Sequence, residues 1–233
     1  IMKYLLGIDF GGGASKATLL GEDGVIAATH TVEYPTNYPQ KGYAEQNPDD
    51  WYSAVRENIS EIFKKSGINK EDIVALCLDA ATHTSVLTDK NGNVLRPAIY
   101  WTDSRSTKEC EYIRKNYADT VLKKALHSVD TIWTLPQLMW VRNNESEIWE
   151  KIGMIFFPKD YIRYLLTGEY CTDYIEAEGS MLFDYNTLTW SEELCGIIGL
   201  DTGILPKIIS PSESAGMICE KAASETGLSR NTK

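Results

Sequence analysis

Short apolar runs near the start of the chain predict a group of β-strands. Three such runs cover residues 3–9, 15–20 and 25–32, and each is long enough for one strand. The Asp-Gly pair at 23–24 joins the second and third runs and is typical of a tight hairpin turn. An uninterrupted apolar run over residues 73–78 predicts a further strand, buried on both faces.

Between the third and fourth runs, the apolar positions change to helical spacing. Trp51, Val55 and Ile59 recur every four residues, which places them along one side of a helix. The Asn-Pro pair at 47–48 is typical of a helix start, and Gly67 is typical of a helix end. The sequence therefore predicts a helix with one buried side between two strands.

Helices dominate the rest of the chain, after a second hairpin predicted over residues 85–95. The predicted helical ranges are 104–117, 135–141, 158–168, 191–198 and 216–227, and the last of these also fits a strand that leads into a helix. Strands, a crossover helix and another strand predict an α/β fold with a mixed β-sheet flanked by helices. No linker rich in Gly, Ser or Pro divides the chain, so we interpret residues 1–233 as one domain.

Composition narrows the class of partner. The chain has 233 residues and a formal charge of −10, which argues against nucleic acid because phosphate backbones select basic surfaces. No run approaches the ~20 apolar residues of a membrane-spanning helix, so we expect no membrane partner. The 5 cysteines are scattered and form no Cys-x-x-Cys pair, which favours reduced thiols in a cytoplasmic protein.

The first predicted strand ends in a carboxylate followed by a run of glycines. This stretch contains Asp9, Gly11, Gly12, Gly13, Ser15 and Lys16. Backbone N–H groups of glycines approach an anion closely because no Cβ intervenes, and Lys16 adds a positive charge. Asp9 is suited to hold a divalent cation, directly or through water. The pattern differs from the G-x-x-x-x-G-K-[ST] P-loop, and a glycine-rich hairpin without a ligand explains it equally well.

Further candidates follow the fourth predicted strand. Thr82 and His83 come directly after it, at a strand end where substrate clefts commonly lie. Asp103, beside the aromatic pair at 100–101, can accept hydrogen bonds from sugar hydroxyls, and Trp133 offers an indole face to a sugar ring. Each residue also has an ordinary explanation, as a structural His, a helix-capping carboxylate or a core Trp.

In this order and at this spacing, the motifs resemble the FGGY carbohydrate kinases, most closely the xylulokinase branch. The segments that carry the resemblance are Gly7-Ile8-Asp9-Phe10-Gly11-Gly12, Glu45-Gln46-Asn47-Pro48-Asp49-Asp50-Trp51, Tyr100-Trp101-Thr102-Asp103-Ser104-Arg105, Phe157-Pro158-Lys159-Asp160-Tyr161 and Met181-Leu182-Phe183-Asp184. The resemblance covers nearly the whole chain. It implies a ribonuclease H-like (actin-like ATPase) fold and phosphoryl transfer from ATP, with Mg²⁺, to a sugar hydroxyl.

The resemblance also implies roles for the candidate residues. Asp9 matches the family's acidic residue near the magnesium ion and the phosphates. The resemblance therefore implies that Asp9 is both a catalytic residue and a metal ligand. The phosphate loop matches Gly11, Gly12, Gly13, Ser15 and Lys16, and the sugar contacts match Thr82, His83, Asp103 and Trp133, with Ile132 as an alternative to Trp133. It further implies that residues 1–233 are the sugar- and phosphate-binding N-terminal domain, and that the general base and the C-terminal ATP-binding domain lie beyond Lys233. We therefore expect no turnover from residues 1–233 alone.

Two departures from the family pattern leave the substrate open. Gly12 stands where the family usually has Thr or Ser, and residues 80–83 differ from the xylulokinase-type Gly-Gln-Met-His. Xylulose is the expected substrate, with ribulose, glycerol, erythritol or gluconate as alternatives. A non-catalytic sugar-binding regulator is a further alternative. The motifs around His83 and Asp103 argue against an actin- or chaperone-like ATPase, because such a protein has no use for sugar contacts. The expected partners are a small-molecule sugar and ATP, and a homodimer is an open possibility.

Overall fold

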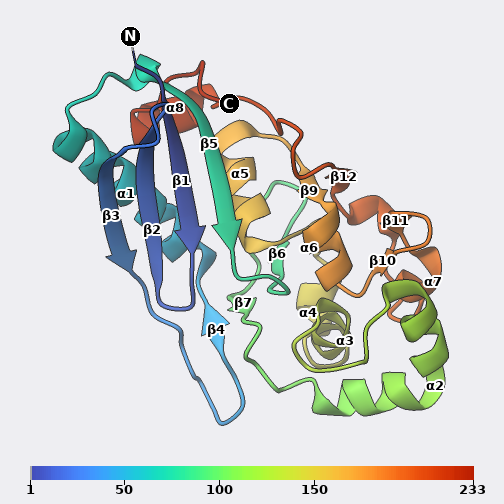
Figure 1. Cartoon of the computed structure of the whole chain (residues 1–233). Helices are drawn as coiled ribbons and strands as arrows, with labels where there is room; N and C mark the ends of the chain where they lie inside the picture. Colours follow the sequence, from blue (N-terminus) through green and yellow to red (C-terminus); the bar gives the residue numbers. More distant parts are fainter. Residues whose placement is uncertain (1) are drawn as a thin grey trace.

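A four-stranded mixed β-sheet forms one side of the molecule, whose computed structural model describes residues 2–233 (Figure 1). Its strands are β1 (Tyr4–Phe10), β2 (Ala14–Gly21), β3 (Ile26–Glu33) and β5 (Ile73–Ala80). They lie in the order β3-β2-β1-β5. Strand β2 is antiparallel to both of its neighbours, β1 and β3, whereas β5 is parallel to β1. The C-terminal ends of β1 and β5 therefore lie at the same end of the sheet, where Asp9 is opposite Asp79. This arrangement confirms the predicted mixed sheet.

Helix α1 (Pro48–Ser66) covers one face of the sheet and packs on β2 and β3. Its N-cap residue Asn47 accepts a hydrogen bond from the Asp49 N–H, and Gly67 ends the helix with a left-handed φ of 66°. A left-handed backbone is comfortable for glycine, which has no Cβ to clash. Both ends confirm the prediction from the sequence.

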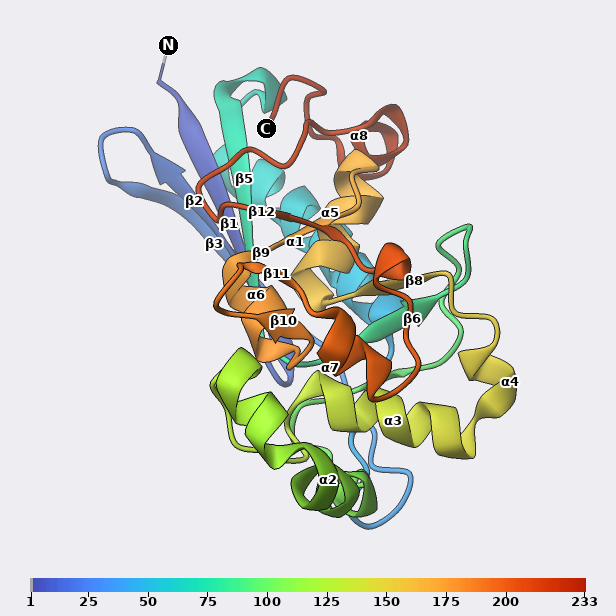
Figure 2. The ribbon, with the colours of Figure 1, turned by 90° about the vertical axis from the view of Figure 1, so that its right-hand side faces the viewer.

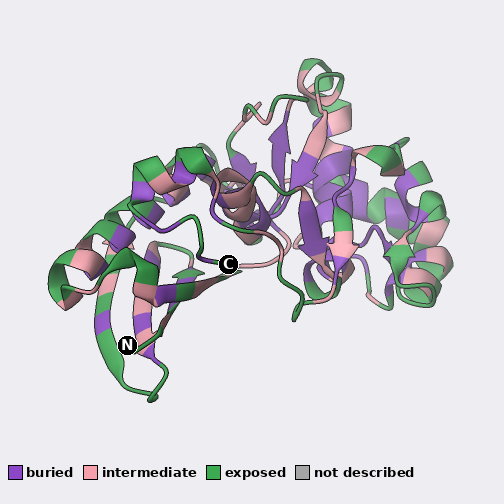
Figure 3. Cartoon of the chain, turned by 90° about the horizontal axis from the view of Figure 1, so that it is seen from above, coloured by how far each residue is buried: buried purple, intermediate pink, exposed green. Residues whose placement is uncertain are grey.

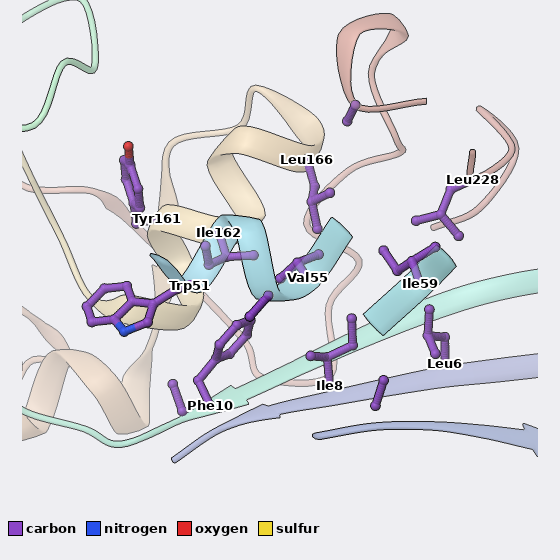
Figure 4. Close-up of a cluster of buried hydrophobic side chains, with 14 of the residues drawn as sticks. Leu6, Ile8, Phe10, Trp51, Val55, Ile59, Tyr161, Ile162, Leu166 and Leu228 are labelled. Atoms are coloured by element: carbon purple, nitrogen blue, oxygen red, sulfur yellow. The ribbon is translucent and has the colours of Figure 1, made fainter. Parts of the chain in front are cut away.

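Alternate side chains of β1 meet α1 in the first of two hydrophobic clusters (Figure 4). Leu6, Ile8 and Phe10 pack with Trp51 and are each at most 2% exposed. Burying a large apolar side chain of this kind contributes about 1.5–3 kcal/mol. Because side chains alternate along a strand, the residues between them, including Asp9, face the other side of the sheet.

A helical region continues from the end of the sheet where β1 and β5 finish (Figure 2). The helices after α1 are α2 (Thr107–Ala125), α3 (Thr134–Asn144), α4 (Ser146–Trp149), α5 (Pro158–Thr167), α6 (Tyr174–Gly179), α7 (Glu192–Gly196) and α8 (Glu220–Thr226). Helix α8 lies near the other end of the sheet, against α1 and α5 (Figure 1). Two 3-10 turns are η1 (Lys70–Asp72) and η2 (Thr202–Ile204). The second hydrophobic cluster joins α2, α3 and α7, whereas α5 and α8 belong to the first cluster. Seen from above in Figure 3, buried segments run through both regions.

Four short strand pairs lie outside the main sheet. They are β4 (Glu45–Gln46) with β7 (Ala98–Ile99), β6 (Val86–Thr88) with β8 (Met154–Phe156), β9 (Cys171–Asp173) with β12 (Lys207–Ile209), and β10 (Phe183–Asp184) with β11 (Thr189–Trp190). The first three pairs join segments far apart in the sequence, whereas β10 and β11 form a local hairpin.

The structure confirms the second predicted hairpin in a short form and corrects one helix. Thr88 bridges Val94, the Leu95 N–H donates to the Leu87 carbonyl at 2.9 Å, and the other edge of β6 pairs with β8. The helix expected over 104–117 begins at Thr107 and extends to Ala125, because its apolar residues continue to pack on the second cluster. This difference arises from contacts between distant segments, which local spacing does not report.

Candidate functional site

Three charged side chains meet at the end of the uncovered face of the sheet. Asp9 on β1 is paired with Lys16 on β2 and with Asp79 on β5. Their strands are adjacent, so regular strand pairing alone places Asp9 between Lys16 on one side and Asp79 on the other. A depression of about 260 Å³ lies over this face, lined by these residues together with Thr18 and Cys77.

The environment of Asp9 disfavours its charge. Partial burial raises the pKa of Asp9, the nearby Asp79 carboxylate raises it further, and Lys16 acts in the opposite direction. Two carboxylates this close together favour a bound cation, which removes their mutual repulsion. Within residues 2–233 no group of three or more His, Cys, Asp or Glu side chains is arranged to hold a metal ion. Any cation at this place would need ligands beyond these two carboxylates.

In the glycine turn between β1 and β2, the carbonyl groups of Gly11 and Gly12 accept hydrogen bonds from side chains of the protein. The Gly11 carbonyl accepts a hydrogen bond of 2.7 Å from the Tyr34 hydroxyl. The Gly12 carbonyl accepts from the Thr36 hydroxyl at 2.7 Å and from the Gln46 amide at 2.9 Å. These bonds fix the turn and satisfy both carbonyl oxygens inside the protein.

Two of the N–H groups of the same turn, those of Gly12 and Gly13, make no hydrogen bond within residues 2–233. Gly11 N–H bonds back to the Ala14 carbonyl at 2.9 Å, but within residues 2–233 Gly12 and Gly13 have no internal acceptor for their amides. Successive free amides form a concave site for an anion. The turn therefore offers two amide donors to an anion near the Lys16 ammonium, and its role as a phosphate loop stays a prediction.

Ser15 differs from the other predicted phosphate-binding residues. Its side chain is fully buried on the α1 face, where the Asn58 amide donates to its hydroxyl at 3.1 Å. Lys16, the next residue, is exposed on the opposite face. The structure therefore does not bring the Ser15 hydroxyl to the depression, and its hydrogen bond instead fastens α1 to β2. The alternation of strand side chains was the signal for this in the sequence.

The loop after β5 holds His83 in an unusual backbone conformation. His83 has a φ of 68°, in the left-handed region that favours glycine. Its N–H donates to the Glu176 carboxylate at 3.2 Å, and its carbonyl accepts from the Thr134 hydroxyl at 2.9 Å. Helices α6 and α3 thus hold this strained residue from two sides. Thr82, next to it, is partly exposed.

The His83 ring lies against Trp133 with one nitrogen left free. Its Nδ1 lies 3.0 Å from the Gly179 carbonyl, which can only accept, so Nδ1 carries the proton and Nε2 is an acceptor. Burial lowers the pKa of His83, and the neighbouring His127 lowers it further. The ring centroids of His83 and Trp133 are 4.5 Å apart in an edge-on arrangement, and the His127 ring stacks on Trp133 at 4.2 Å. A neutral imidazole and an indole are therefore in direct contact beside the loop after β5.

Asp103 has all its contacts inside the protein. Its buried carboxylate accepts from the Ala44 N–H at 2.6 Å and from the Arg105 guanidinium at 2.8 Å. Arg105 also pairs with Glu45 at 2.8 Å. The structure therefore places Asp103 in a network that holds the segment before α2. Trp101, from the same motif, is 40% exposed. Its backbone N–H donates a hydrogen bond to the Thr84 hydroxyl, next to the His83 loop.

A cluster of buried charges supports the His83 loop from α5 and α6. Lys159 contacts Asp160 at 3.0 Å, Asp173 at 2.8 Å and Glu176 at 3.7 Å. Burial raises the pKa of Glu176 to about 8, with Lys159 opposing and Asp160 adding to the rise. Sequence reasoning missed this cluster, although the Thr-Asp pair at 172–173 is a typical helix start. Asp79 and Tyr100 lay within candidate motifs of the sequence but received no role, and the structure pairs Asp79 with Asp9 and places the Tyr100 hydroxyl beside Gly12.

Comparisons with known proteins agree with this geometry. Residues 4–233 match the model of the FGGY family of carbohydrate kinases, N-terminal domain. The chain is 34% identical over 232 residues to a xylulose kinase of Bacillus subtilis (strain 168), and this match covers 100% of the chain and 46% of that protein. The chain thus spans about half the length of the curated relatives it matches.

Solved structures show the same fold. A ligand-bound xylulose kinase from Lactobacillus acidophilus superposes with a TM-score of 0.93 at 26% identity, covering 99% of this chain and 47% of that one. A gluconate kinase from the same organism has a TM-score of 0.94 at 26% identity, covering 100% of this chain and 47% of that one. In residues 2–233 no helix is long and apolar enough to cross a membrane.

Proposed function

The chain belongs to the FGGY family of carbohydrate kinases, and we propose that its gene product transfers a phosphoryl group from ATP to a hydroxyl of xylulose. The proposal depends chiefly on one observation. Because β1 and β5 are parallel neighbours, the turn after Asp9 and the loop that carries His83 leave the sheet at the same end. The Ala81 N–H donates to the Phe10 carbonyl at 3.1 Å, so the two loops are in direct contact.

The phosphate side of the proposed site uses backbone and charge. The free amides of Gly12 and Gly13 and the Lys16 ammonium stabilise negative charge on the phosphates of ATP. Asp9 and Asp79 fit a Mg²⁺ ion, which in phosphate sites takes one or two carboxylates together with phosphate oxygens and water. When bound, the ion neutralises charge on the transferring phosphoryl group.

The sugar side uses one hydrogen-bond acceptor and one apolar wall. Nε2 of His83 accepts a hydrogen bond from a sugar hydroxyl, while the Trp133 ring, with Thr82 and Trp101 near the loop, limits where the sugar can lie. Phosphoryl transfer depends largely on positioning and charge neutralisation, and a rigid wall supplies positioning. A role for Asp103 in sugar contact stays a prediction, because its carboxylate is bonded to Arg105 and Ala44.

A substrate panel tests the proposal. The full gene product that contains this chain is assayed for ADP release with MgATP and, in turn, xylulose, ribulose, glycerol, erythritol and gluconate. We expect kcat/KM to be highest for xylulose. Gluconate is included because a gluconate kinase shares the fold closely. Absence of sugar-dependent ADP release with all five compounds would contradict the proposal.

A non-catalytic sugar-binding regulator is the second candidate, motivated by the glycine at position 12. It predicts calorimetric binding of a sugar without turnover, and a gain of activity when Gly12 is replaced by Thr. The kinase proposal predicts turnover in the unmodified protein.

A further inference from the structure

We infer that Tyr100 places its hydroxyl over the glycine turn and donates a hydrogen bond to a phosphate oxygen of ATP, a role that rests on the proposed kinase function. Gly12 is the residue at which the chain departs from the family motif. A Cβ built on Gly12 would lie only 2.9 Å from the Tyr100 hydroxyl oxygen. The hydroxyl thus occupies the space that a side chain at position 12 would take.

The Tyr100 hydroxyl is an available donor. Tyr100 is 6% exposed, and burial raises its pKa, so the phenol keeps its proton at neutral pH. A hydrogen bond with the Trp101 side chain acts in the opposite direction on this pKa. Within residues 2–233 the Tyr100 hydroxyl donates no hydrogen bond to another protein group, whereas the neighbouring Tyr34 hydroxyl donates to the Gly11 carbonyl.

The surroundings of this donor point to an anion. The carbonyls of Gly11 and Gly12, the nearest backbone acceptors of the turn, are already bonded to Tyr34, Thr36 and Gln46. The free groups that remain around Gly12 are donors: its own amide, the amide of Gly13 and the Tyr100 hydroxyl. A set of donors without an internal acceptor matches the oxygens of a phosphate group.

The geometry also makes residues 12 and 100 mutually dependent. After the hydroxyl oxygen, the next atom of Tyr100 near the built Cβ is Cζ at 3.7 Å, which is ordinary van der Waals contact. Tyr100→Phe therefore opens room for a side chain at position 12 while it keeps the ring. Gly12→Thr in the presence of Tyr100 forces a displacement, whereas Gly12→Thr with Tyr100→Phe returns one hydroxyl to the turn.

The test is a double-mutant cycle on the full gene product, with calorimetric Kd for MgATP as one readout and KM for ATP and for the sugar as the second. We expect Tyr100→Phe to weaken ATP binding by about 10-fold, the loss typical of one hydrogen bond to a charged group, with the KM for the sugar unchanged within about twofold. Gly12→Thr alone is expected to weaken ATP binding and to lower the melting temperature. The double variant is expected to recover most of both losses.

Three results separate this inference from the proposed function. If Tyr100→Phe binds ATP as tightly as the unmodified protein, the inference is wrong. If the unmodified protein binds ATP with a Tyr100-dependent Kd but phosphorylates none of the sugars, the proposed function fails and the hydroxyl contact stands. If the two substitutions are simply additive, the shared space at position 12 is refuted.

Discussion

The two sides of the proposed site are built in opposite ways. The phosphate side lies on regular strands, and Asp9, Lys16 and Asp79 face a shallow, open depression. The sugar side lies on an irregular loop, where His83 has a left-handed backbone and is held by helices α3 and α6. Strand pairing fixes side chains without further help, whereas a strained loop residue needs buried partners. Substitutions on the open side should therefore change activity, and those behind the braced side should change stability.

The largest expected effect is a loss of stability when the buried ion pair between Asp103 and Arg105, in the segment before α2, is broken. Asp103→Ala leaves the Arg105 guanidinium buried without its main partner, since both side chains are only 1% exposed. Removing one member of a buried ion pair typically costs about 3–5 kcal/mol, and we expect a loss of this order in the free energy of unfolding. Urea unfolding measures it, with exposed Asp119→Ala as the control. A loss equal to that of the control would show that the pair is not a brace.

On the open side, Asp9→Asn should lower kcat by about 100-fold or more, because one strong electrostatic contact to the transferring group is removed. The same change should leave the free energy of unfolding unchanged or slightly higher, since it removes the partial burial of a charge and the repulsion from Asp79, which together raise the pKa of Asp9. Steady-state kinetics and thermal unfolding are measured together, with Asp119→Asn as the matched control. A variant that unfolds and loses activity in parallel would contradict the separation of the two sides.

The pH dependence of stability tests the buried support of the sugar side, where Glu176 accepts a hydrogen bond from the His83 N–H. The native protein keeps the Glu176 proton up to about pH 8, whereas the unfolded chain loses it near pH 4.5. The native state binds more protons in this window, so the free energy of unfolding falls as pH rises through it, by an amount on the order of 5 kcal/mol for a pKa difference of 8 minus 4.5. Lys159, Asp160 and Asp173 face the same carboxyl group.

Glu176→Gln should remove this fall, because an amide does not titrate. Urea unfolding at pH 5, 6.5 and 8 provides the measurement, and Glu147→Gln, on the exposed surface of α4, is the control. Equal slopes with pH for the unmodified protein and Glu176→Gln would refute the assignment.

The smallest expected effect concerns the wall of the sugar side. Trp133→Ala should raise the KM for the sugar by about 10-fold, the scale of one lost apolar contact surface, with the KM for ATP unchanged. Trp133 is flanked by the rings of His83 and His127, so Trp133→Phe should retain most of the affinity. Initial rates over a grid of both substrates test this. An equal rise in both KM values would place Trp133 outside the sugar side.

Local features of the sequence were sufficient for the sheet and for α1. The strand runs, the Asn-Pro start and Gly67 act through neighbours in the chain, and the structure confirms them. Short elements were missed, because β8 and β9 have three residues each and depend on partners far along the chain.

The site shows the same limit. The turn after Asp9 and the loop with His83 could be recognised as motifs in the sequence. The pairing of Asp9 with Asp79 could not, because these residues are far apart along the chain. Contacts between Gly12 and Tyr100, and between His83 and Glu176, are of the same kind. Single-sequence spacing carries no signal for such contacts, so the fold had to supply them.

The most direct test of the account is a crystal structure of the full gene product with a non-hydrolysable ATP analogue, Mg²⁺ and xylulose. We predict phosphate oxygens against the amides of Gly12 and Gly13, and xylulose within hydrogen-bond distance of His83 Nε2. Phosphates bound away from the turn after Asp9, or a sugar bound away from the loop after β5, would contradict it.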